Sequence, residues 1–253
     1  MDPGLRVREA FHLHVLRQLA ARLAGRPYAV KGGMGLRFFH RSPRLSEDMD
    51  FDIGPSLPIP TLQKHVDAVL TGRALLHSLQ SQGVGSIEFS RSKQTETTQR
   101  WKVGLLVAGV RLSTRLEFSR RKVAHATERG TVRPELLRDA FLPPFVASFY
   151  GAAAMGAQKI LALASPSRTA ARDLFDLHHL FFQTRLSPAV LGPLINPDML
   201  EEAIEKAGRF DYRDFRDQVL PFLPEDLQGL YGNAPAFEQL RHDVQERLKE
   251  ARA

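Results

Sequence analysis

The segment that decides the fold is Val30–Ile53, which reads VKGGMGLRFFHRSPRLSEDMDFDI. It begins with a glycine pair and ends with three aspartates at alternate positions, Asp48, Asp50 and Asp52. Because a β-strand points alternate side chains to the same face, a strand here presents three carboxylates on one face and apolar side chains on the other. The segment therefore predicts a strand with one face in the core and one acidic face.

The acidic face of this strand predicts a bound cation. Like charges on one face repel each other and need to be neutralised, and Mg²⁺ is the simplest neutraliser because it takes oxygen ligands and brings phosphates with it. A solvated acidic edge is the alternative, since charged edges protect sheets from aggregation. The alternation with Met49, Phe51 and Ile53 favours the metal site. Two carboxylates are enough, so Asp52 is the least secure of the three.

The glycine pair, Gly32 and Gly33, stands between a strand expected over Tyr28–Lys31 and a helix expected over Met34–His40. Backbone N–H groups at a helix N-terminus favour an anion. Most glycine pairs mark ordinary turns, but here the acidic strand follows soon afterwards. A phosphate cradle followed by metal-binding carboxylates is what phosphoryl or nucleotidyl transfer requires.

The composition limits the class of protein. The 253 residues fit one large domain or two smaller ones, and the absence of cysteine excludes disulfides, thiol catalysis and zinc–thiolate sites and is compatible with the cytoplasm. No secretory signal is expected, because the first residues contain no long apolar stretch, and no membrane span is expected, because no apolar run reaches about 18 residues. The net charge of +7 indicates either a solvated arginine-rich surface or a polyanionic partner such as RNA.

The segments after the acidic strand predict an α+β protein. Glu117 lies on the polar face of the last of three expected strands, and this strand could lie beside the acidic strand and supply a third carboxylate. The Ala108-Gly109 pair suits a tight hairpin between the last two strands. The expected helices cover residues 5–24 and 61–80, and the expected strands cover residues 84–90, 100–107 and 111–119.

The C-terminal part reads as helical. A proline-rich stretch ending at Pro144 suggests two domains, 1–142 and 143–253. Asp173 and Asp176 share a helix face, and Lys159 and Arg172 are cations that could meet either a nucleotide phosphate or these acids. From this segment alone, ion pairs within the helices are the favoured explanation for these acids and cations. Helices are expected over 152–164, 167–183 and 237–252, and another begins at Asn196-Pro197 and ends before Gly208.

Taken together, several blocks resemble the AbiEii/AbiGii family of nucleotidyltransferase toxins, which includes the MenT toxins. They lie between about residue 30 and residue 180 in the family's order. One departure from the family is Met34, because many relatives have Ser or Thr after the glycine pair. Methionine at this position lacks the hydroxyl that could touch a phosphate. The matching blocks are KGGMGLR (31–37), RLSEDMDF (44–51), RLE (115–117), QKILA (158–162) and RDLFDL (172–177).

The resemblance implies a DNA polymerase-β-like nucleotidyltransferase domain with a mixed sheet, followed by a helical domain that closes the nucleotide cleft. It implies that Asp48 and Asp50 hold Mg²⁺, with Glu117 as the candidate third ligand. It also makes Lys159 the residue that faces the triphosphate and Asp173 an essential acid. The residues expected to bind the nucleotide are Gly32, Gly33, Arg37, Ser46, Lys159 and Arg172.

The expected activity is Mg²⁺-dependent transfer of a nucleoside monophosphate from an NTP to an RNA acceptor, with release of pyrophosphate. Family resemblance makes a tRNA 3′ end the expected acceptor, blocked translation the consequence, and a cognate antitoxin the partner. One alternative is transfer to a protein or small-molecule hydroxyl, although the positive charge disfavours a cationic small substrate. Another is a non-catalytic nucleotide- or RNA-binding protein, which the intact set of acids disfavours.

Overall fold

The computed structural model describes residues 3–120, 126–167 and 170–252, which form two compact units. The sheet unit contains the described residues up to Arg41 and those from Leu45 to Tyr150. The helical unit contains Ser42–Arg44 and the described residues from Gly151 onward. The division falls after Tyr150 and not after residue 142, because the residues just before Gly151 form a strand of the sheet.

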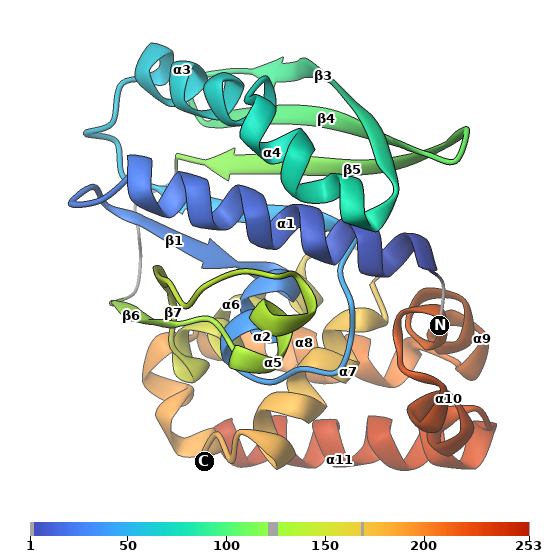
Figure 1. The fold of residues 1–253 in the computed structure, drawn as a ribbon. Helices are drawn as coiled ribbons and strands as arrows, with labels where there is room; N and C mark the ends of the chain where they lie inside the picture. The colour runs from blue at the N-terminus through green and yellow to red at the C-terminus, as the bar shows by residue number, and fades with distance from the viewer. Residues whose placement is uncertain (1–2, 121–125, 168–169, 253) are drawn as a thin grey trace. The chain divides into compact units, whose positions relative to one another are not determined.

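The described strands of the sheet unit form one mixed seven-stranded sheet in the order β3-β4-β5-β2-β1-β7-β6 (Figure 1). β2 runs antiparallel to β1 and parallel to β5, and β1 runs parallel to β7. The strands are β1 (Tyr28–Lys31), β2 (Asp48–Ile53), β3 (Val84–Gln94), β4 (Thr98–Val107), β5 (Val110–Ser119), β6 (Thr127–Thr131) and β7 (Val146–Tyr150).

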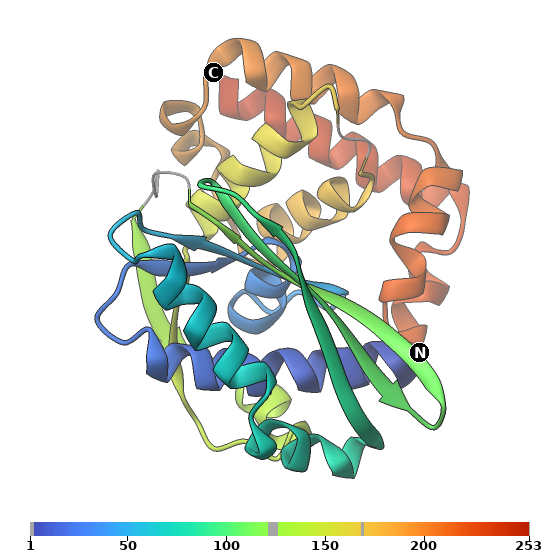
Figure 2. The same cartoon turned by 90° about the horizontal axis from the view of Figure 1, so that it is seen from above.

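The strand β2 lies within this sheet and has the two faces that its sequence predicted. Met49, Phe51 and Ile53 are fully buried, whereas the three aspartates between them are only partly buried. The apolar face packs in one core with the helices α1 (Pro3–Arg22), α3 (Ile59–Leu70) and α4 (Arg73–Leu79), which cover this side of the sheet (Figure 2). The aspartates therefore lie on the opposite face.

The β4–β5 hairpin is confirmed. Ala108 and Gly109 both have positive φ angles, 48° and 81°, as a two-residue type I′ turn requires. Trp101 on β4 is fully buried and donates its indole N–H to Asp67 Oδ1 at 2.8 Å. The only tryptophan of the chain is therefore a core residue.

Three elements between residues 126 and 150 were not expected from the sequence: β6, β7 and the helix α5 (Pro134–Asp139). β6 pairs only with β7 at the edge of the sheet, and its sequence TERGT is almost wholly exposed. An edge strand of this kind carries no apolar alternation, so the period-2 signal is absent. Residues 121–125 lie outside the described part of the chain.

The helical unit contains α6 (Ala152–Ala164), α7 (Arg172–His178), α8 (Pro197–Arg209), α9 (Tyr212–Gln218), α10 (Glu225–Tyr231) and α11 (Ala234–Arg252). The helix predicted over 167–183 begins later than expected, at Arg172, and continues after His178 as a π-helix over His179–Gln183. Residues 168–169 lie outside the described part of the chain. The Asn196 side chain caps α8 by accepting from the Asp198 N–H at 2.8 Å. α8 continues past Gly208, which corrects the predicted helix end.

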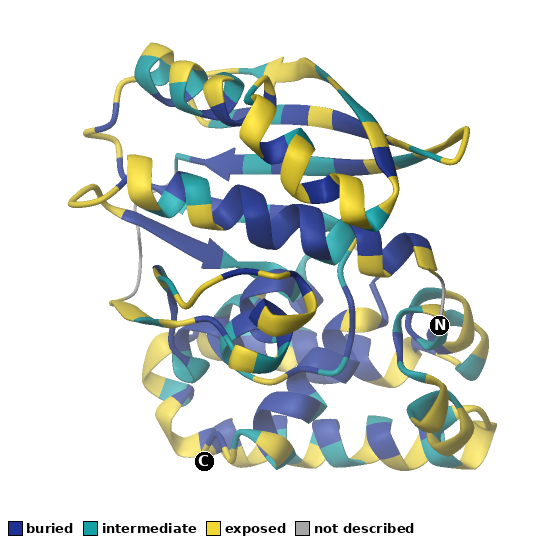
Figure 3. Ribbon diagram, in the orientation of Figure 1, coloured by how far each residue is buried: buried dark blue, intermediate teal, exposed yellow. Residues whose placement is uncertain are grey.

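The terminal helix α11 is amphipathic. Its buried residues follow helical spacing, whereas most of its other residues are exposed (Figure 3). The buried side contacts α7 and α8, so α11 closes the core of the helical unit. None of the helices in the described residues has the length and apolar character needed to cross a bilayer. The buried residues are Phe237, Leu240, Val244, Leu248 and Ala251.

Candidate active site

The glycine pair directly follows a strand, as predicted, but it forms the first two residues of the helix and not a turn before it. β1 ends at Lys31 and the helix α2 (Gly32–Phe39) begins immediately. Gly32 has a φ of +66°, and a Cβ at this position would lie 2.9 Å from Asp50 Oδ2. Both the left-handed backbone and the approach of the carboxylate require glycine here. The start of α2 is therefore built against one of the predicted catalytic acids.

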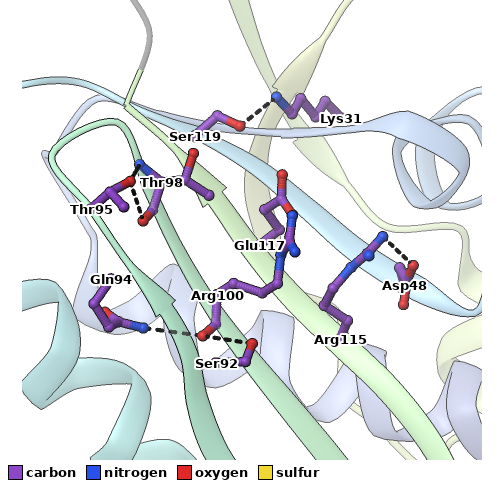
Figure 4. A network of polar contacts seen from close by, with 10 residues as sticks. All are labelled: Lys31, Asp48, Ser92, Gln94, Thr95, Thr98, Arg100, Arg115, Glu117 and Ser119. Atoms are coloured by element: carbon purple, nitrogen blue, oxygen red, sulfur yellow. Dashed lines mark hydrogen bonds and ion pairs between the residues drawn. The ribbon is translucent and has the colours of Figure 1, made fainter. Parts of the chain in front are cut away.

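The carboxylates of β2 and β5 lie in adjacent positions. β5 pairs in parallel with β2 so that Glu117 stands opposite Asp50 and Arg115 stands opposite Asp48. This confirms the prediction that the strand carrying Glu117 lies beside the acidic strand. Figure 4 shows the side chains of Asp48, Arg115 and Glu117 on the same face of the sheet. Three predicted metal ligands are thus brought to neighbouring positions.

Arginines from the neighbouring strands compensate two of these acids. Arg115 Nη2 lies 2.5 Å from Asp48 Oδ2, and Arg100 Nε donates to Glu117 Oε2 at 2.7 Å. Burial raises the pKa of Asp50; Lys31 lowers it, and the nearby Asp48 and Glu117 raise it further. The neighbouring carboxylates of Asp48 and Glu117 therefore give a negative potential at Asp50, and this potential favours a bound cation.

Asp52 is held by a different set of groups. Lys31 lies opposite Asp50 in β1 but gives its hydrogen bond to Asp52 Oδ1 at 2.5 Å, and it also donates to Ser119 Oγ at 3.1 Å. The Tyr150 hydroxyl donates to Asp52 Oδ2 at 2.8 Å. Both oxygens of Asp52 thus have protein partners, which suits a structural neighbour of the site better than a metal ligand.

The remaining residues of the predicted nucleotide grip lie as follows. Arg37 on α2 donates from Nε to Glu9 Oε1 at 2.5 Å. The Ser46 hydroxyl donates to the backbone carbonyl of Asp48 at 3.1 Å. Arg172 is exposed at the first residue of α7. Their contacts with phosphate stay predictions.

The helical unit contains a buried cluster of four ionisable side chains. Lys159 on α6 lies 2.9 Å from Asp173 Oδ1 and 2.6 Å from Asp176 Oδ2, both on α7. Arg44 donates from Nε and Nη2 to the two oxygens of Asp176 at 2.9 and 2.8 Å. Each side chain is at most 8% exposed. Although burial raises the pKa of Asp176, Arg44 and Lys159 lower it well below its usual range.

Sequence reasoning gave no role to Arg44, although it stands in a matched block. It lies four residues before Asp48, in the short segment Ser42–Arg44 that belongs to the helical unit, whereas the residues on both sides belong to the sheet unit. Its partner is 132 residues away in the chain. No local pattern reports such a pairing.

The donor chemistry of the acidic face fits Mg²⁺. Asp48, Asp50 and Glu117 offer carboxylate oxygens at adjacent positions, which is what a hard divalent cation takes. Within the described ranges, no group of three or more acidic or histidine side chains is arranged so that it could hold a metal ion as it stands. Asp48 and Glu117 are turned toward their arginines, so the ligand assignment stays a prediction.

The comparisons with known proteins concern the fold and the family of the chain. No curated protein matches the chain. A candidate nucleotidyltransferase from H. pylori of known crystal structure has a TM-score of 0.51 and 19% identity, with 94% of this chain and 95% of that chain covered. The crystal structure of JHP933 from Helicobacter pylori has a TM-score of 0.50 and 20% identity, with 94% and 92% covered. At these identities the likeness shows a common fold.

The family comparison covers nearly the whole chain. The family described as nucleotidyl transferase AbiEii toxin, type IV toxin–antitoxin system, matches residues 14–249. This range includes the glycine turn, the acidic strand, Glu117 and the buried cluster of the helical unit. The chain therefore belongs to the AbiEii family of nucleotidyl transferase toxins, whose partner in a type IV system is an antitoxin.

Proposed function

We propose that this protein is a Mg²⁺-dependent enzyme that transfers a nucleoside monophosphate from an NTP to the 3′ hydroxyl of an RNA, with a tRNA 3′ end as the acceptor. The observation that carries the proposal is the row of carboxylates formed by Asp48, Asp50 and Glu117 beside the Gly32 turn. The hydroxyl loses its proton to solvent and its oxygen forms a bond to the α-phosphorus. The bond from that phosphorus to the oxygen that bridges it to the β-phosphorus breaks, and pyrophosphate leaves. Blocking the 3′ end of tRNA stops translation.

In this proposal the row of carboxylates holds the metal. When bound, Mg²⁺ supplies positive charge to the phosphate oxygens and lowers the pKa of the attacking hydroxyl. Asp50 is the central ligand, because its pKa is raised by burial and by the two acids beside it, and a cation relieves that repulsion. Asp48 and Glu117 complete the set by exchanging their arginine partners for the metal.

The backbone N–H groups at Gly32 and Gly33 face phosphate oxygens in this proposal, since they begin α2 and have no partners within the helix. Arg37, Ser46 and Arg172 supply further contacts to the nucleotide. Lys159 is held by Asp173 and Asp176, which use two of the three donors of its ammonium group. We assign the third donor of Lys159 to the triphosphate. In this proposal Asp173 orients the Lys159 ammonium group.

The test uses the purified protein, MgCl₂, each α-³²P-labelled NTP in turn, and total tRNA. We expect label in tRNA with the wild type, none with Asp50→Asn, and strongly reduced label with Lys159→Met. Asp52→Asn is the matched control, because it removes the same charge from the same strand face at a position whose carboxylate binds Lys31 and Tyr150. It should retain transfer. Circular dichroism confirms that each variant is folded.

The acceptor atom is tested by oxidising the tRNA with periodate, which destroys the terminal 2′,3′-diol. Loss of labelling after oxidation supports the 3′ end, whereas unchanged labelling excludes it. Label that appears in protein or a small molecule instead of RNA supports the alternative acceptors. If labelled NTP binds but is transferred to none of these acceptors, the proposed reaction is wrong. Addition of EDTA should abolish transfer if the metal is required.

A further inference from the structure

The face of β3, β4 and β5 that points away from the helices is basic. Trp101, Val103 and Leu105 on β4 are buried on the helix side, so the residues between them project from the other face. Cross-strand register extends this face to β3 and β5. It carries two acids, Glu88 and Glu117, and five basic side chains, Lys93, Arg100, Lys102, Arg111 and Arg115.

These basic residues are in register with the predicted catalytic acids. Lys102 stands opposite Arg115, which stands opposite Asp48. In the next row, Lys93 stands opposite Arg100, Arg100 stands opposite Glu117, and Glu117 stands opposite Asp50. With strands about 4.8 Å apart, Lys102 lies two strands, roughly 10 Å, from Asp48 at the level of the Cα atoms. The basic face therefore begins beside the acids and extends away from them.

The outer residues of this face are exposed. Lys93, Lys102 and Arg111 all project into solvent. Arg111 lies 3.5 Å from Glu88, but both side chains are more than 60% exposed, so solvent weakens this pair. The lack of a side chain at Gly104 leaves room for the Arg111 guanidinium to lie across β4.

The helix side of the same strands is different. Arg91 on β3 stands opposite Trp101 and binds Asp67 of α3, so its charge is used within the unit. On these three strands, the positive charge that exceeds the acids therefore lies on the face shared with the predicted catalytic acids. Such a surface attracts a polyanion, and its closeness to the acids suits a polyanion whose end must reach them.

We propose that this basic sheet face binds the phosphate backbone of the acceptor RNA, upstream of the 3′ hydroxyl that the acids receive. The inference rests on the proposed function, because it takes the acids as the site of transfer. Lys93, Lys102 and Arg111 stand on three adjacent strands, with Lys93 opposite Arg100 and Arg111 opposite Leu106 of β4. At about 3.4 Å per residue these positions spread the cations over roughly 20 Å along the strands, which suits successive phosphates better than a single anion. Contacts with phosphate position the strand without reading its sequence.

The first experiment measures binding without transfer. A triple variant, Lys93→Ala/Lys102→Ala/Arg111→Ala, is compared with the wild type by fluorescence anisotropy on periodate-oxidised tRNA at several salt concentrations. The control triple variant, Arg26→Ala/Lys64→Ala/Arg73→Ala, removes three exposed cations from the helices and loop on the other side of the sheet. We expect the face variant to bind about tenfold more weakly, and the slope of log K against log salt to fall by about 2, at roughly 0.7 per lost phosphate contact. The control should match the wild type.

The second experiment separates docking from chemistry. Transfer is measured with full-length tRNA and with a trinucleotide that has a free 3′ hydroxyl but too few phosphates to reach the outer face. The face variant should show a raised KM for tRNA, an unchanged kcat, and trinucleotide transfer equal to that of the wild type.

Equal salt slopes for the face variant and the control would overturn the proposal. Loss of polyglutamate binding as large as the loss of tRNA binding would instead assign the face to an acidic protein. If the wild type transfers nucleotide to no RNA, the proposed function fails, while the salt titration still decides whether the face binds RNA.

Discussion

Replacing Arg44 with methionine tests the buried cluster of the helical unit. The Arg44 guanidinium makes two hydrogen bonds to Asp176, and both side chains are almost completely buried. Without Arg44, Asp176 keeps the charge of Lys159, which it shares with Asp173. Removing one partner of a buried ion pair costs about 3–5 kcal/mol, because the remaining charge stays buried without compensation. We expect the variant to lose that amount of its free energy of unfolding.

Urea unfolding measures this loss with two probes. Far-UV circular dichroism follows both units, whereas the fluorescence of Trp101 reports only the sheet unit. Because the cluster lies in the helical unit, Arg44→Met should shift the dichroism transition to lower urea more than the fluorescence transition. Arg44→Lys keeps the charge but loses the two-point contact, so it should fall between the wild type and methionine.

The double variant Arg44→Met/Asp176→Leu decides how the loss arises. It removes the whole pair and leaves Lys159 with Asp173, so no net buried charge remains. Its stability should recover most of the loss, since apolar replacements of a buried pair are often neutral. If Arg44→Met costs less than about 1 kcal/mol, or if the double variant is as unstable as the single one, the reasoning is wrong.

Two further predictions concern the sheet unit. Asp50→Asn should abolish transfer and yet raise the thermal midpoint of the metal-free protein by about 2–4 °C. It removes the cost of a buried charge and its repulsion from Asp48 and Glu117, which together exceed the lost attraction to Lys31 by about 1 kcal/mol. A lowered midpoint in differential scanning fluorimetry would contradict this. Burial and Arg8 lower the pKa of His12 to about 3, so the unfolded state takes up its proton first. Stability should therefore fall as the pH decreases from about 6.5 toward 3, by up to about 1.4 kcal/mol per pH unit. His12→Gln keeps an N–H donor for Thr114 and should flatten that slope in urea titrations at pH 6 and pH 4.

The sequence predicted the acidic strand well, because its position half in the core leaves a strict alternation. Asp48–Ile53 is buried at every second residue, because its aspartates alternate with Met49, Phe51 and Ile53. The neighbouring strand followed from the same argument, since Glu117 stood on its polar face. The edge strand Thr127–Thr131 could not be found, because an exposed edge has no buried face to mark it.

The partners of the site residues were harder to predict than the residues themselves. Arg115 is two residues from Glu117, so the alternation that placed one on the polar face also placed the other there, and its pairing with Asp48 needed only the strand order. The pairing of Arg44 with Asp176 carries no such signal. It joins a loop to a helix far along the chain, and neither segment shows a periodicity that names the other.

The two arginines on the acidic face connect the metal proposal with the RNA proposal. Arg100 and Arg115 now compensate Glu117 and Asp48. A divalent cation on the same carboxylates would compete with both guanidinium groups, because each carboxylate would be compensated by the metal. The released Arg115 lies between Asp48 and Lys102, and the released Arg100 lies between Glu117 and Lys93, on the path proposed for the acceptor backbone. Metal binding would then strengthen RNA binding, because both depend on the same pairs of charges.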